Sequence, residues 1–171
     1  MLGWNPKSTE EFFTLAQLVQ AFELSQVNTA NPIFDTEKLD WYNSHYIRKL
    51  SIDELLTYCQ PYLPTADPAY LKQIIALEQE RLKKLSDITE LTDFFFPEVL
   101  QYEPTLLIWK KSTAEATRIV LQKLLVLLET HADWSVTALE ITLLAWIKAQ
   151  GLGNGDVLWP LRVALSGKKA S

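Results

Sequence analysis

Apolar residues recur every three or four positions along almost the whole chain, and this spacing predicts helices. No stretch shows the alternation of apolar and polar residues that is typical of a half-buried strand. The fold class is therefore predicted to be all-α. The clearest apolar stripe consists of Leu71, Ile74, Ile75, Leu82 and Leu85.

Helix start and stop signals divide the chain into successive helices. Residues 8–11 and 51–54 match the capping box, in which a serine or threonine and a glutamate three residues later bind each other's backbone amides. Asp35 and the pair Asp67-Pro68 are start signals, whereas Gly151 suits a helix end. Helices are expected over residues 12–24, 35–50, 51 to 61 or 64, 68–85, from 86, from 104, 112–130, 135–150 and 156–165, with a turn at 153–155.

Two proline-rich stretches are candidate boundaries, and no internal repeat is present. Prolines punctuate residues 61–68, which read as a stiff linker, and a second candidate lies at residues 97–104. We place the boundary in the first stretch. The chain is thus predicted to consist of residues 1–64 and residues 65–171.

Composition narrows the classes of function. The net charge of −5 argues against a surface that coats nucleic acid throughout, although local basic patches fit an acidic body. The chain has neither an apolar run of membrane-spanning length nor a signal peptide at its start, so a cytoplasmic protein without membrane contact is expected. One cysteine and two histidines exclude an internal disulfide and argue against a closed zinc site. Cys59 lies in an apolar helical stretch and is expected to be a packed, unreactive thiol.

Three segments resemble a known family. Residues 34–43, F-D-T-E-K-L-D-W-Y-N, continue to Tyr46-Ile47-Arg48 and resemble the F-D-x-x-K-L-x-W-x-N…Y-I-R signature of glutamyl-tRNA synthetases. Residues 2–4, L-G-W, and residues 160–167, P-L-R-V-A-L-S-G, resemble two further family segments in the same order. The resemblance covers almost the whole chain.

The resemblance implies a helical bundle of the class I synthetase anticodon-binding type, with two or three small lobes. Residues 1–64 would form a linker that contacts the tRNA stem. Residues 65–171 would form the anticodon-binding domain, cut short because the family continues further. The family's H-x-G-H-type motif and K-x-S-K loop are missing here. The tail with Lys168 and Lys169 is not that loop, because it follows the P-L-R segment. No catalytic residue, metal or cofactor is therefore expected in this chain. The implied partners are a glutamate tRNA and the enzyme's own ATP-using catalytic domain, in a monomer.

Arg81 is the leading candidate for an RNA-binding residue. On the wheel of a helix over residues 68–85 it borders the apolar stripe, from which it can reach outward. A guanidinium can donate two hydrogen bonds to one base edge. The resemblance adds that family enzymes which discriminate the glutamate from the glutamine anticodon place an arginine near this point. The alternative is a solvated charge that pairs with Glu78 or Glu80.

Lysines on the same predicted helix could hold phosphates, a role that is independent of base sequence. These are Lys72, Lys83 and Lys84, and each is also compatible with a plain surface lysine. Lys168 and Lys169 could touch phosphate or form a solvated tail.

For each of two further arginines, the sequence leaves two interpretations open. Arg162 fits either an RNA contact or a salt bridge or helix cap. Arg48 ends a predicted helix, where a cation suits the helix dipole, so we favour a structural role ahead of an RNA backbone contact. Trp41 and Tyr42 are expected to pack in the core.

A second class of function fits the same composition: a helical protein-interaction scaffold that does not bind RNA. The excess of acidic over basic residues in the chain supports this class of function. An independent enzyme is disfavoured, because acid pairs such as Asp53 and Glu54 stand at helix starts, where capping explains them. The tRNA-binding hypothesis predicts a basic concave face that contains Arg81 and Arg162.

Overall fold

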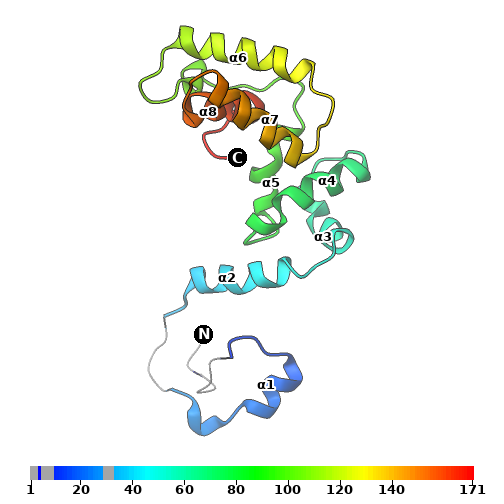
Figure 1. The fold of residues 1–171 in the computed structure, drawn as a ribbon. Helices are drawn as coiled ribbons and strands as arrows, with labels where there is room; N and C mark the ends of the chain where they lie inside the picture. Colours follow the sequence, from blue (N-terminus) through cyan, green and yellow to red (C-terminus); the bar gives the residue numbers. More distant parts are fainter. Residues whose placement is uncertain (1–3, 5–9, 29–32) are drawn as a thin grey trace.

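The computed structural model describes Trp4 and residues 10–28 and 33–171, and in these ranges every regular element is a helix. The helices follow one another along an elongated molecule, from α1 through α2 and the group α3 to α5 to the group α6 to α8 (Figure 1). The all-α prediction is confirmed. The α-helices are α1 (Leu15–Ala21), α2 (Thr36–Ile47), α3 (Ile52–Cys59), α4 (Pro68–Glu78), α5 (Asp87–Thr92), α6 (Ala114–Glu129), α7 (Val136–Ala149) and α8 (Asn154–Ser166). Single 3₁₀ turns are η1 (Leu24–Gln26), η2 (Gln60–Tyr62), η3 (Gln79–Arg81), η4 (Asp93–Phe95) and η5 (Pro104–Leu107).

Most helix starts lie where capping chemistry places them. The Ser51 hydroxyl accepts from the Glu54 amide at 3.3 Å, and the Glu54 carboxylate accepts from the Ser51 amide at 2.9 Å. This closes the predicted capping box of α3. Asp35 caps α2 through the Lys38 amide at 2.9 Å. Such caps satisfy backbone donors that have no partner inside the helix.

The first helix differs from its prediction. Ser8 of the predicted capping box lies outside the described residues, and the helix begins at Leu15 instead of Phe12. Thr14 and Gln17 form the capping box that starts it. Phe12 instead stacks on His45 of α2, with ring centroids 3.8 Å apart. The predicted start was wrong because packing against α2 holds Phe12 outside the helix.

The helix predicted over residues 68–85 is also shorter than expected. It ends at Glu78, passes through one turn of 3₁₀ helix and becomes extended at Leu82. Gln79 donates to the backbone carbonyls of Ile47 and Leu50 at 3.0 and 2.9 Å. These bonds tie the end of α4 to the end of α2. Lys83 and Lys84 therefore do not share a helix with Arg81, and the helical-wheel argument for Arg81 was wrong.

The turn predicted at residues 153–155 belongs in part to α8, which begins at Asn154. Gly155 lies in the first helical turn against the ring of Trp109. A side chain at this position would collide with that ring, so glycine here serves close packing instead of a turn. The expected stop at Gly151 is confirmed, since its φ of 66° ends the helical path after α7.

Within the described ranges, two separate hydrophobic cores define two lobes. The first lobe comprises α2 to α5 and the second comprises α6 to α8. Along the sequence, residues 97–104 separate the residues of the two cores. Residue 64 instead separates α3 from α4, and these two helices pack on the same core. That the parts on either side of residue 64 have different functions stays a prediction. The first core contains Ile47, Leu55, Cys59, Ile75, Leu82 and Ile88, and the second contains Val120, Leu124, Ile147 and Val157.

Two polar contacts anchor the second lobe to the chain that precedes it. Trp159 of α8 donates its indole N–H to the Leu106 carbonyl of η5 at 2.8 Å. Lys168, just after α8, lies 2.6 Å from Asp93 of η4. In the part of the chain that the structure describes, no helix has the length and apolar character needed to cross a membrane. Trp41, expected in the core, is 46% exposed.

Candidate nucleic-acid interface

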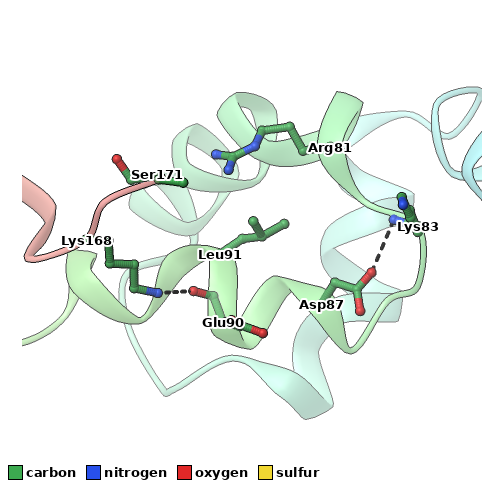
Figure 2. A pocket seen from close by; sticks show the side chains of 8 residues that line it. Arg81, Lys83, Asp87, Glu90, Leu91, Lys168 and Ser171 are labelled. Atoms are coloured by element: carbon green, nitrogen blue, oxygen red, sulfur yellow. Dashed lines mark hydrogen bonds between the residues drawn. The ribbon is translucent and has the colours of Figure 1, made fainter. Parts of the chain in front are cut away.

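A recess of about 290 Å³ lies where α5 and η3 meet the segment that follows α8. Figure 2 shows side chains from these elements around it, with Leu91 forming an apolar floor between charged groups. The recess is not uniformly basic, because three cationic and two anionic side chains line it. The charged lining residues are Arg81, Lys83, Asp87, Glu90 and Lys168.

Arg81 projects into this recess from η3. Its Nη1 atom lies 2.8 Å from the Glu78 carboxylate, whose side chain is 6% exposed, whereas the Arg81 side chain is 42% exposed. Figure 2 shows the Arg81 side chain extending over Leu91 toward the segment of Lys168 and Ser171. The guanidinium is therefore anchored at one side and accessible at the other.

Backbone hydrogen bonds hold the turn that carries Lys83 and Lys84. The Asp87 carboxylate accepts from the Lys83 and Lys84 amides at 3.3 and 2.9 Å, which fixes the turn before α5. The ammonium of Lys84 is 3.9 Å from the same carboxylate. Lys83 lines the recess, and its ammonium makes no ion pair within the described ranges.

Lys168 lines the recess with its charge already engaged. Its ammonium lies 2.6 Å from Asp93, donates to the Glu90 carbonyl and sits 5.7 Å from the ring centre of Phe94. The side chain is only 28% exposed. These contacts join the segment after α8 to α5 and η4.

Two further candidates form contacts within the first lobe. Lys72 lies 2.6 Å from Asp53, which links α4 to α3. Arg48 donates to the Glu80 backbone carbonyl at 3.0 and 3.3 Å and pairs with the Glu80 carboxylate at 3.1 Å. These bonds satisfy a carbonyl at the end of η3, which supports the structural role that the sequence favoured for Arg48.

Arg162 and Lys169 are exposed and lie outside the recess lining. Neither makes an ion pair with any residue in the described part of the chain. The structure brings Arg81, Lys83 and Lys168 together, and it does not bring Arg162 to them. Arg162 does not line this recess, and a concave face that contains both Arg81 and Arg162 stays a prediction.

The acidic residues of the recess were not predicted from the sequence. Glu78 was considered only as a possible ion-pair partner of Arg81, and its burial was not predicted. Asp87 and Glu90 put two acceptors into the lining. Glu78 lies seven residues after Leu71, in the register of the apolar stripe, and is buried. A charged residue at a stripe position was the signal that could have singled it out.

The chain is an all-α protein in which an arginine is held at the rim of a mixed-charge recess. Residues 54–171 match the model of a family described as the anticodon binding domain. The chain belongs to this family.

Relatives of known name extend the match to almost the whole chain. A glutamate–tRNA ligase of Clostridium acetobutylicum is 39% identical over 99% of this chain and 36% of its own length. That of Clostridium tetani is 39% identical over 99% of this chain and 35% of its own length. The chain thus spans about a third of the length of these relatives.

Solved structures agree with the fold. A glutamate–tRNA ligase from Elizabethkingia meningosepticum superposes with a TM-score of 0.76 at 27% identity, over 98% of this chain and 34% of that one. The glutamate–tRNA synthetase of Elizabethkingia anophelis gives a TM-score of 0.73 at 26% identity, over 98% of this chain and 33% of that one.

Proposed function

We propose that this chain is the tRNA-binding part of a glutamate–tRNA ligase and that it reads anticodon bases at the recess beside Arg81. The ATP-dependent attachment of glutamate would belong to a catalytic domain in the rest of such an enzyme. The family match and the 39% identical relatives support this assignment.

The observation that carries the proposal is the half-exposed guanidinium over the recess. Arginine offers only donors, five in all. An unpaired cytosine presents two adjacent acceptors on its pairing edge, whereas guanine presents two donors and one acceptor there. A donor fork that meets the pairing edge therefore favours cytosine. The third anticodon base is cytosine in glutamate tRNAs and guanine in glutamine tRNAs, so one arginine could separate the two.

Phosphate contacts would supply affinity without base preference. Lys83, Lys84, Arg162 and Lys169 have exposed side chains that suit this role. Lys72, Arg48 and Lys168 already bind acidic partners or carbonyls. We therefore expect them to contribute less to the affinity for RNA. Residues 1–64 are proposed to contact the tRNA stem and the catalytic domain of the same polypeptide, in a cytoplasmic monomer.

The test is a filter-binding titration of this chain with two RNA hairpins. One carries the anticodon arm of a glutamate tRNA, and the other differs only by guanine in place of the third anticodon cytosine. We expect tighter binding to the first, by roughly 5- to 150-fold, which is the range of one two-bond arginine contact. Binding should also weaken steeply with salt. Equal or absent binding would overturn the proposal.

A helical scaffold for protein partners is the competing function. It is favoured by exposed apolar side chains on the second lobe, among them Leu125, Val126 and Ile141, which are 58%, 62% and 64% exposed. Exposed apolar patches often mark protein contacts. The same titration separates the two functions, because a scaffold would not distinguish the hairpins.

A further inference from the structure

Two features of the position of Glu78 disfavour a charged carboxylate there. It is the last residue of α4, where the helix dipole disfavours negative charge. Its side chain is 6% exposed, so it has also lost most of its contact with water. A leucine or glutamine would fit this position on the apolar stripe without either cost. The contact that compensates the charge is the bond from Arg81 at 2.8 Å.

The 3₁₀ turn that follows Glu78 brings Arg81 into line with it. In an α-helix, residues three apart point about 60° away from each other, given 3.6 residues per turn. In a 3₁₀ turn they eclipse. Because η3 begins directly after Glu78, Arg81 is stacked over the Glu78 carboxylate. The carboxylate is packed against the core and therefore offers a fixed point of attachment.

We propose that Glu78 is a positioning residue that fixes the direction of the Arg81 guanidinium and thereby its ability to distinguish one base from another. This inference rests on the proposed function and names a second residue needed for it. Glu78 binds one N–H of the guanidinium from the core side. The remaining donors then face the recess with a defined orientation, as two-bond recognition requires.

Without the Glu78 charge, Arg81 has other acceptors within the same recess. Asp87 and Glu90 both line it, and RNA phosphates would be additional partners. A mobile guanidinium still attracts phosphate, but it no longer presents two donors at a fixed angle. Loss of Glu78 should therefore lower the discrimination between bases, while the binding that does not depend on the base holds or rises.

The experiment compares the wild-type chain with Glu78→Gln on the two hairpins described above. Glutamine keeps the size of the side chain and removes the charge. We expect the ratio of the two affinities to fall from at least about 5 in the wild-type chain to about 1, with undiminished binding to the guanine hairpin. Glu129→Gln is the matched control, since Glu129 is also the last residue of its helix but is exposed. It should leave the ratio unchanged.

A double variant distinguishes positioning from general loss of structure. If Glu78 acts through Arg81, Glu78→Gln adds no further loss of discrimination to Arg81→Lys. Weaker binding of Glu78→Gln to both hairpins by the same factor would show a merely structural role and overturn the inference. An unchanged ratio in Glu78→Gln, with a wild-type chain that discriminates, would overturn the inference alone. A wild-type chain that does not discriminate would overturn the proposed function as well.

Discussion

The Lys168 ammonium lies 2.6 Å from the Asp93 carboxylate, and this ion pair ties the end of the second lobe to the first. The same ammonium donates to the Glu90 carbonyl at the rim of the recess. One side chain thus contributes both to the lining of the recess and to the arrangement of the lobes that form it.

The variant Lys168→Met is expected to loosen this junction while leaving both cores intact. Asp93 is 53% exposed and water screens the pair, so the loss of unfolding free energy should be about 1 kcal/mol or less. Hydrogen exchange at the backbone amides of residues 90–96 should nevertheless become faster. Lys169→Met is the control, because Lys169 is exposed and makes no ion pair in the described part. Unchanged exchange in Lys168→Met would contradict this role.

Gly155→Ala is expected to destabilise the second lobe. An alanine Cβ would stand 2.2 Å from Nε1 of Trp109, whose ring packs against Trp159 at 4.7 Å between centroids. Relief of the collision requires movement of a packed ring, at a cost of about 1–3 kcal/mol. Thermal melting followed by circular dichroism measures the loss, and tryptophan emission should change with it.

Gly153→Ala provides the comparison for that measurement. Its Cβ would approach the Asp156 carboxylate oxygen at 2.9 Å, at the far end of a flexible side chain that can move away. A much smaller loss is expected. Equal melting temperatures for the two variants would show that the Trp109 contact does not limit this position.

Cys59 should make stability depend on alkaline pH. Burial raises the pKa of this thiol from 9.0 to about 11. The folded state thus keeps its proton over a range in which the unfolded chain has lost it. The contribution is fully present below pH 9 and is lost as the pH rises toward about 11. Urea unfolding at several pH values measures this slope, which should be shallower in Cys59→Ala. Identical slopes in the two proteins would contradict the assignment.

Helix starts could be predicted from the sequence because capping is a local interaction. Ser51 and Glu54 close their box within four residues, and Asp35 binds an amide three residues away. The end of α4 could not be predicted in this way. It depends on Gln79, whose amide reaches carbonyls 29 and 32 residues away.

Arg81 was selected from the sequence partly for a reason that the structure does not support. A continuous helix would have placed it beside an apolar stripe, whereas a 3₁₀ turn stacks it over Glu78. Whether it reads a base stays a prediction. The acids of the recess were missed because Asp87 and Glu90 reach it only when α5 folds back beside η3.

The all-α class, most helix starts and the family resemblance could be read from the sequence, since apolar spacing, caps and short motifs are properties of neighbouring residues. Where α4 stops, which way Arg81 points and which charges share the recess became known only from the folded chain. Those features depend on contacts between segments far apart in the chain, such as Lys168 with Asp93, and local pattern carries no information about them.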